Sequence, residues 1–330
     1  MSVSPPPSDM SPPFPAAQAI KGLPTTVAGR WIYALKPASW PKLLVPTLLG
    51  QALGVTVVAG FSWMACALGV AFTLALGAAI VWLNDWADQP VDRIKRAMFP
   101  TGGSPKTIPD GILSARAVGL AGALAAGLAL ALAGLGGHLL GRPWLGLAAL
   151  LCLACFVAYS LPPLRLNYRG GGEALEALGV GLLLPGFQAY LQAGETWGAV
   201  YPYLVGHGLL ALASALASGL SDEDSDRGGG KRTFTTSWGN ARVRRAVQRC
   251  VSLAALAWLV AALAQPTQAR WPGLLAAVVL LALMEWPRRL SPQAVTGAFA
   301  AQGRYKAALH GVSWSATAAL ALALLLQGRG

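Results

Sequence analysis

The sequence has few charged residues for its length. Asp, Glu, Lys and Arg make up 12% of the 330 residues, whereas hydrophobic residues make up 55%. A soluble domain usually has about twice that share of charged residues. This shortage argues against an ordinary water-soluble protein. Together with long uncharged runs, it predicts a protein that crosses a membrane several times.

Cysteine is also scarce, and the four cysteines form no metal-binding or disulfide pattern. Cys152 and Cys155 make a CxxC pair, but the pair lies inside the apolar run LLCLACFVAY and has no second pair or histidine nearby. We therefore interpret both as small packing residues. A nucleotide-binding loop of the Walker type is absent, because RGGGKRT lacks the required spacing and follows no predicted strand.

The N-terminal segment lacks the pattern of a secretory signal. MSVSPPPSDMSPPFPAAQ is rich in proline and serine and has no basic stretch followed by an apolar one. We expect residues 1–30 to form a disordered tail. Residues 31–330 are expected to form a single transmembrane domain.

Nine apolar segments are long enough to cross a bilayer, so we predict an all-α, polytopic membrane protein. A few have only about 15 to 18 residues, which is short against the usual length of about 20. The segments lie near residues 43–60, 63–83, 116–137, 144–162, 174–194, 201–220, 248–264, 271–285 and 305–326.

The basic residues orient these nine segments. With the N-terminus in the cytoplasm, 22 of the 25 Lys and Arg residues fall on the cytoplasmic side. Such a bias is typical of multi-pass proteins of an inner or plasma membrane. It also accounts for the net charge of +12 without nucleic acid, since cytoplasmic basic residues contact anionic headgroups.

Two acidic clusters follow even-numbered segments and therefore converge on the cytoplasmic face. In NDWADQPVD, helical spacing places Asn84, Asp85 and Asp88 on one face, and Pro90 predicts that the helix ends close by, with Asp92 after the turn. In DEDSDRGGGKRT, Asp222 and Asp226 are four residues apart, and three glycines end the helix.

Acidic residues at the membrane edge are costly, so they usually serve a function. Clustered carboxylates suit Mg²⁺, which is commonly bound by one or two carboxylates plus substrate phosphates. Four basic residues close to the clusters are candidates for the remaining phosphate charge: Lys95, Arg96, Lys231 and Arg232. The residues thus predict a site for Mg²⁺ and a diphosphate.

Three motifs in order resemble the UbiA superfamily of intramembrane prenyltransferases. NDWADQPVD resembles the first signature of that family, and DEDSDRGGGKRT resembles the second. Between them, YSLPPLRLNYRGGGE resembles the loop after the fourth span. The resemblance implies nine helices around a central cavity with a cytoplasmic cap. It also implies Mg²⁺-dependent transfer of an isoprenyl group from a polyprenyl diphosphate to an aromatic acceptor.

The resemblance also implies roles for individual residues. Asp85, Asp88 and Asp92, with Asn84, would serve one metal and diphosphate site. Asp222 and Asp226 would serve the other, Lys231 would contact the diphosphate, and Arg93 is a further substrate-binding candidate. The five carboxylates Asp85, Asp88, Asp222, Asp226 and Glu173 are the expected catalytic groups.

Five residues near the motifs have an ordinary structural explanation as well as a functional one. Tyr159 can anchor the interface or bind substrate, and Arg165 and Arg169 can hold an acceptor carboxylate or simply follow the charge bias. Glu173 can stabilise a helix start or deprotonate a phenolic acceptor. Lys106 can fold over the diphosphate or belong to an ordinary turn.

The acceptor is less sharply indicated than the reaction. NYRGGGE resembles the menaquinone-type members, which prenylate 1,4-dihydroxy-2-naphthoate, and we favour that branch. YSLPPLRL and NDWADQPVDRIKR resemble other members, so 4-hydroxybenzoate, homogentisate, chlorophyllide or a lipid remain alternatives. A cation-coupled transporter is the rival class, but a transport pathway would distribute its charges through both leaflets.

Overall fold

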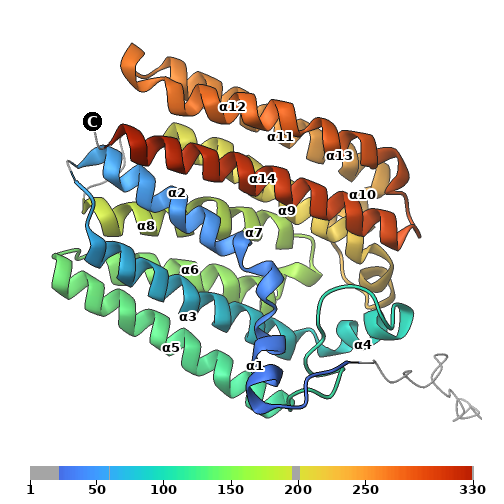
Figure 1. The fold of residues 1–330 in the computed structure, drawn as a ribbon. Helices are drawn as coiled ribbons and strands as arrows, with labels where there is room; N and C mark the ends of the chain where they lie inside the picture. Colours follow the sequence, from blue (N-terminus) through green and yellow to red (C-terminus); the bar gives the residue numbers. More distant parts are fainter. Residues whose placement is uncertain (1–21, 59, 195–200, 329–330) are drawn as a thin grey trace, which may run out of the picture.

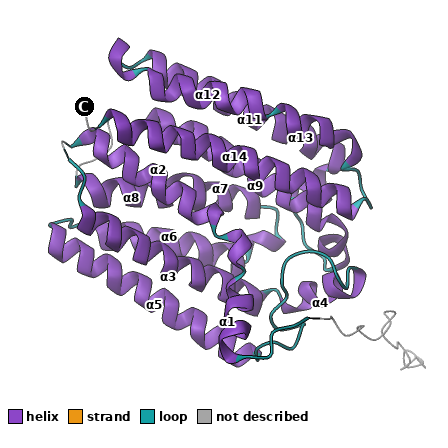
Figure 2. Ribbon diagram, in the orientation of Figure 1, coloured by secondary structure: helices purple, strands orange, loops and turns teal. Residues whose placement is uncertain are grey.

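The computed structural model describes residues 22–58, 60–194 and 201–328, and regular structure there is helical throughout (Figures 1 and 2). Residues 1–21 of the expected tail lie outside this part of the chain. The first described helix, α1, spans Val27–Leu35.

Each of the nine apolar segments coincides with a helix or a continuous helical run. The helices are α2 (Pro41–Val57), α3 (Trp63–Ala87), α5 (Ala115–Leu140), α6 (Leu145–Ser160), α7 (Gly172–Leu178) with η3 (Gly179–Leu183) and α8 (Leu184–Ala193), α9 (Tyr201–Gly228), α11 (Asn240–Leu263), α12 (Trp271–Leu283) and α14 (Phe299–Gln327). They lie side by side in one bundle (Figure 1).

Six of these runs are long and apolar enough to cross a membrane: α3, α5, α7 to α8, α9, α11 and α14. Helices α2 and α6 are apolar but shorter, and α12 has 13 residues. The chain is therefore an integral membrane protein, as predicted.

Short helices lie at the right-hand end of the bundle in Figure 1. They are α1, α4 (Gln89–Met98), α10 (Phe234–Trp238) and α13 (Glu285–Leu290), and the single turns η1 (Pro37–Ser39), η2 (Leu166–Tyr168) and η5 (Ser291–Gln293) belong to the same connections. The remaining turn, η4 (Thr267–Ala269), joins α11 to α12.

Proline and glycine set the two helix ends that carry the acidic motifs. Helix α3 stops at Ala87, and Pro90 occupies the first turn of α4, where a missing backbone N–H costs nothing. Helix α9 stops at Gly228, as the three glycines predicted, and Gly230 has a positive φ of 71°. Both acidic motifs therefore lie where a long helix gives way to a loop or a short helix.

Small residues bring the long helices close together, as in other membrane bundles. Gly50 of α2 is packed against α8: a Cβ atom there would overlap the carbonyl oxygen of Pro185 and the Cβ of Gln188. Gly127 of α5 has nothing within 4 Å of such an atom. The two glycines differ in packing although both lie in apolar helices.

Replacing Gly50 by Ala is expected to destabilise the protein by about 1–3 kcal/mol, because overpacking forces α2 and α8 apart. Gly127→Ala is the matched control and is expected to leave stability unchanged or slightly raised. Thermal unfolding in detergent measures both. Equal melting temperatures for the two variants would contradict the close packing of α2 on α8.

Candidate functional site

A polar cavity of about 200 Å³ lies where α3, α4, α7 and α9 meet. Its walls carry five acidic side chains from the sequence motifs and four lysines. The acidic residues from the motifs are Asp88, Asp92, Glu173, Asp222 and Asp226, and the lysines are Lys36, Lys95, Lys106 and Lys231. Glu176, which lies outside the motifs, is a sixth acidic residue of the wall. The two acidic clusters predicted to converge therefore face one cavity.

Each lysine of the cavity pairs with an aspartate from another segment. Lys36 pairs with Asp85, Lys106 with Asp92, Lys95 with Asp222, and Lys231 with Asp88 at 2.7 Å. Like charges held this close would repel strongly in a poorly solvated site. The lysines neutralise the negative charges. Their pairs connect the first motif and α4 to the end of α1, to α9, to the loop after α4 and to the loop after α9.

The first cluster is held by polar contacts from several elements. Asn84 Nδ2 donates to Asp88 Oδ2 at 3.4 Å, which confirms that the two share a helix face. Tyr168 donates its hydroxyl to Asp88 Oδ1 at 3.0 Å. Asp85 is only 1% exposed and accepts from Lys36 and from the Thr107 hydroxyl, the latter at 2.6 Å. Asp85 lies behind the cavity wall rather than on it.

The second cluster occupies the last turns of α9. Asp222 and Asp226 line the cavity together with Ser218 and Ser225, so this face of the helix is mainly polar. Glu173, at the start of α7, is buried and accepts from the backbone N–H of Phe234 at 2.7 Å. That bond fixes α7 against the segment that follows α9.

Burial and neighbouring charges shift the pKa values of the loop and α4 groups in this cavity. Burial acts to lower the pKa of Lys231, but Asp88 and Asp226 outweigh it and raise that pKa above its ordinary value. Asp92 and Asp222 do the same for Lys106. Burial raises the pKa of Asp92, although Lys106 opposes the shift. The two lysines therefore stay positively charged at neutral pH.

The donor set suits a hard cation shared with a phosphate ligand. Within the described ranges, no three acidic, His or Cys groups converge as a preformed metal site. Mg²⁺ does not require one, since it is usually bound by one or two carboxylates while waters and phosphates complete its shell. The carboxylates on opposite walls of the cavity fit that mode of binding.

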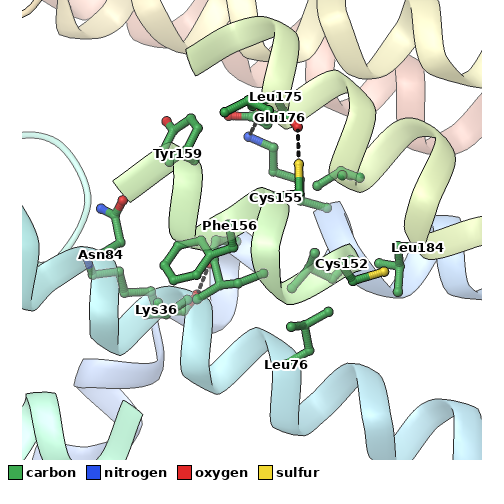
Figure 3. Close-up of a pocket in the computed structure, with 17 residues that line it drawn as sticks. Lys36, Leu76, Asn84, Cys152, Cys155, Phe156, Tyr159, Leu175, Glu176 and Leu184 are labelled. Atoms are coloured by element: carbon green, nitrogen blue, oxygen red, sulfur yellow. Dashed lines mark hydrogen bonds and ion pairs between the residues drawn. The ribbon is translucent and has the colours of Figure 1, made fainter. Parts of the chain in front are cut away.

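A second, mainly apolar cavity of about 250 Å³ adjoins the polar one, and Figure 3 shows the residues that line it. Leu76, Cys152, Phe156 and Leu184 line its walls (Figure 3). The two cavities share four lining residues: Lys36, Asn84, Tyr159 and Glu176. A ligand with a charged head and an apolar body therefore finds both environments in direct succession.

The remaining predicted residues lie away from the cavity wall. The side chains of Arg93, Arg169 and Arg232 are exposed. Arg165 donates to the carbonyl oxygen of Ala87 at 2.7 Å and lies 3.7 Å over the ring of Tyr168. Arg96 binds Asp110, with Nε and Oδ1 2.7 Å apart.

The residues that hold the first cluster were not assigned to the site from the sequence, although Tyr168 lies in the loop that was expected beside it. Lys36 and Thr107 hold Asp85, and Tyr168 holds Asp88 while its ring lies 4.7 Å from the Lys231 ammonium. Lys36 lies in the basic segment before the first apolar run, where the positive-inside bias already explained it. Its left-handed backbone, with φ of 50°, brings α1 back toward α3, and no sequence signal announced that turn.

Comparison with known proteins identifies the family. Residues 43–302 match the UbiA prenyltransferase family. The chain belongs to this family. It is therefore a prenyltransferase, and the resemblance drawn from the three sequence motifs is confirmed.

Two curated relatives share a name. The 1,4-dihydroxy-2-naphthoate octaprenyltransferase of Mycobacterium leprae is 28% identical over 222 residues, which cover 66% of this chain and 72% of the relative. The enzyme of that name from Mycobacterium tuberculosis is 28% identical over 240 residues, covering 72% and 79%. Both support the naphthoate branch that the sequence favoured.

Solved structures of UbiA homologues share the fold. A homologue from Archaeoglobus fulgidus bound to DMAPP and Mg²⁺ has a TM-score of 0.65 at 17% identity, covering 87% of this chain and 99% of the other. The apo homologue from Aeropyrum pernix has a TM-score of 0.61 at 17% identity, covering 92% and 99%.

Replacing Lys36 by Met is expected to destabilise the fold by about 3 kcal/mol, because Asp85 would remain buried without its ion-pair partner. The double variant Lys36→Met/Asp85→Asn should recover most of that loss. Chemical denaturation in detergent measures the cycle.

Arg289→Met supplies the control for that cycle. Arg289 pairs with Glu285 at the exposed surface, so its loss should have no measurable effect. If Lys36→Met also left the stability unchanged, the ion pair with Asp85 would not be holding α1 in place.

Proposed function

We propose that the protein transfers an isoprenyl group from a polyprenyl diphosphate to 1,4-dihydroxy-2-naphthoate, with Mg²⁺, as a step in quinone synthesis. The observation that carries this proposal is the pair of acidic clusters facing each other across one lysine-lined cavity. An apolar cavity continues from it. This arrangement suits a diphosphate head and an isoprenoid body.

The diphosphate and its metal would occupy the polar cavity. Asp88 and Asp92 from one wall and Asp222 and Asp226 from the other would hold Mg²⁺, with Asn84 beside them. Lys95, Lys106 and Lys231 would contact the phosphate oxygens as point charges. Asp85, which Lys36 and Thr107 bind, would fix the helix end that presents Asp88.

Bond breaking needs charge stabilisation on the leaving group. Bound Mg²⁺ would supply Lewis-acid stabilisation of the diphosphate. The chain's lysines would neutralise the remaining charge as the allylic carbon–oxygen bond breaks, since preorganised cations act strongly in a water-poor site. The apolar walls around Phe156 and Leu76 would exclude water, which would otherwise capture the allylic cation.

Carbon–carbon bond formation would take place near the boundary of the two cavities. Tyr159 lines both cavities, as do Asn84 and Glu176, and all three are labelled in Figure 3. An electron-rich ring carbon of the acceptor would form a bond to the prenyl carbon as the diphosphate leaves, and the ring proton would pass to the released diphosphate. Glu173, in the adjoining polar cavity, is the candidate to deprotonate the phenolic group of the acceptor.

The naphthoate acceptor and the long prenyl chain are taken from the relatives' names and the NYRGGGE motif. The apolar cavity would hold the isoprene units nearest the diphosphate, and the remainder of a long chain would extend toward lipid. Arg165 and Arg169 are the sequence candidates for the acceptor carboxylate, and their exposed or partly buried positions allow contact only with a group near the cytoplasmic surface.

We also propose nine membrane crossings with the N-terminus in the cytoplasm. The bias of basic residues supports this topology. The gathering of α1, α4, α10 and α13 at one end of the bundle agrees with a cytoplasmic cap over the site (Figure 1).

Purified protein in detergent is expected to form prenylated 1,4-dihydroxy-2-naphthoate from an allylic diphosphate and Mg²⁺, with loss of product in Asp88→Ala. Mass spectrometry reads the product against a panel that includes 4-hydroxybenzoate, homogentisate and chlorophyllide. Product from another acceptor would overturn the naphthoate assignment. The absence of product and of diphosphate release with every pair would contradict the proposal and favour the transporter alternative.

Lys231→Met is expected to weaken binding of the allylic diphosphate by about 10- to 100-fold, because a charged hydrogen-bond donor is lost from a buried anion site. Chelation of Mg²⁺ should abolish turnover in the unmodified protein, and added Mg²⁺ should restore it. Steady-state kinetics measures both effects. Arg242→Met, an exposed residue of α11, is the control and should bind like the unmodified protein. Turnover that survives chelation would contradict the metal requirement.

A further inference from the structure

Glu223 is a buried carboxylate next to the second acidic cluster that takes no part in the cavity. It lies between Asp222 and Asp224 on α9, yet it is only 1% exposed. One residue along a helix turns the side chain by about 100°. Asp222 thus faces the cavity while Glu223 faces α11 and α14.

The Glu223 carboxylate accepts hydrogen bonds from three separate segments. Asn240 Nδ2, at the start of α11, donates to Oε2 at 3.1 Å. The Thr296 hydroxyl lies 3.0 Å from Oε1 and 3.1 Å from Oε2. Gln302 Nε2, in the first turns of α14, donates to Oε2 at 3.4 Å. Arg227, one turn later on α9, pairs with Oε1 at 3.3 Å.

These contacts continue into a wider polar network. Asn240 Oδ1 accepts from Arg244 Nε at 2.8 Å, and Arg244 also donates to the Ser291 carbonyl oxygen at 2.6 Å. Gln302 donates to the carbonyl oxygen of Val295 at 3.0 Å. The Ser291 end of this segment is therefore connected to Glu223 through Arg244 and Asn240, and Gln302 at the other end contacts Glu223 directly.

The same segment also contacts α4, which carries Asp92 of the first acidic cluster. The ring of Phe299, at the start of α14, stacks on Phe99 with centroids 3.8 Å apart and an interplanar angle of 8°. The ammonium of Lys95 lies 5.9 Å from the Phe299 centroid, and Lys95 pairs with Asp222. Residues 291–302 thus connect both acid-bearing segments from outside the cavity.

Stability alone does not call for a carboxylate at this position. Replacing a buried ionic group by apolar residues of similar volume is often neutral or stabilising, whereas a charged network fixes one particular arrangement. A carboxylate that binds donors from α11, α14 and the loop before it restricts how the end of α9 can rotate.

We propose that Glu223 is a positioning residue that sets the orientation of Asp222 and Asp226 by fastening the end of α9 to residues 291–302. The proposal rests on the proposed function, because it concerns how the diphosphate and Mg²⁺ site is assembled. It predicts that loss of the carboxylate weakens the site without touching any group that contacts the ligand.

Glu223→Gln tests this role, because it keeps the size of the side chain but turns one acceptor atom into a donor facing Asn240, Thr296 and Gln302. Glu285→Gln is the matched control, since Glu285 also pairs with an arginine four residues later but at the exposed surface. The full-length protein in detergent is titrated with a non-hydrolysable allylic thiodiphosphate and Mg²⁺. Replacing a group that orients metal ligands typically lowers the affinity of the site about 10- to 100-fold. The same loss of affinity for the thiodiphosphate and Mg²⁺ is expected for Glu223→Gln.

Amide hydrogen exchange supplies a second readout that does not depend on ligand binding. In Glu223→Gln, amides of residues 222–232 are expected to exchange at least about tenfold faster, while those of α3 and α5 stay unchanged, because local opening is separable from global unfolding. Uniformly faster exchange across all helices would show a merely structural role and overturn the proposal. Unchanged exchange in residues 222–232 would overturn it as well.

The two arms separate this inference from the proposed function. If the unmodified protein does not bind the thiodiphosphate, the proposed function is wrong, and hydrogen exchange still decides whether Glu223 fixes the end of α9. If the unmodified protein binds and Glu223→Gln binds equally well, only the positioning role is wrong. If Glu223→Gln does not fold, Thr296→Val removes one donor to the same carboxylate and should shift both readouts in the same direction by a smaller factor.

Discussion

The site depends on the neutralisation of clustered carboxylates by lysines from distant parts of the chain. Asp88, Asp92 and Asp222 each pair with a lysine that lies on another element. Without these pairs, several negative charges would repel one another at the edge of a bilayer, where water screens them poorly. The pairing determines which segments must meet: α4 must lie against α9, and the loops after both helices must fold over them. A phosphate ligand bearing a metal could replace lysine–aspartate contacts with metal–aspartate and lysine–phosphate contacts, so charge balance would be kept on binding.

The ends of α3 and α9 keep the acidic residues at the membrane edge, where the lysines can pair with them. A long apolar helix that continued into water would carry its carboxylates away from the membrane. Helix α3 instead ends at Ala87, and α4 starts at Gln89 with Pro90 in its first turn, so Asp88 occupies the corner between them. At the second motif, α9 ends at Gly228, and Lys231 returns toward Asp226, to whose carbonyl its backbone N–H donates at 2.8 Å. Each motif therefore combines an acidic helix end with a basic return.

Features set by local chemistry could be predicted from the sequence, and features set by long-range packing could not. The apolar runs, the ends of α3 and α9 and the shared face of Asn84 and Asp88 follow from hydrophobicity, proline, glycine and helical spacing. The convergence of the two acidic clusters followed from counting spans. The pairing of Lys36 with Asp85 was not predicted, because it depends on a left-handed backbone turn between α1 and α2. Arg93 and Arg232 were expected near phosphate because they adjoin the motifs, but helical rotation in one case and the path of the loop in the other leave their side chains exposed.

The two faces of the end of α9 have different roles: one carries the carboxylates of the cavity, and the other is bound to α11 and α14. Asp222 and Asp226 point into the cavity, where their charges must remain available to a ligand, so they cannot also be fully bound by protein groups. The pair that Asp222 forms with Lys95 would be exchanged when a ligand binds, so the cavity face alone does not hold the helix end in both states. The opposite face holds it through Glu223, whose carboxylate is bound by Asn240 of α11, Gln302 of α14 and the Thr296 hydroxyl. Glu223 lies directly after Asp222 and three residues before Asp226 on the same helix. Residues this close in a helix cannot rotate independently, so the contacts of Glu223 also fix the directions of the two aspartates.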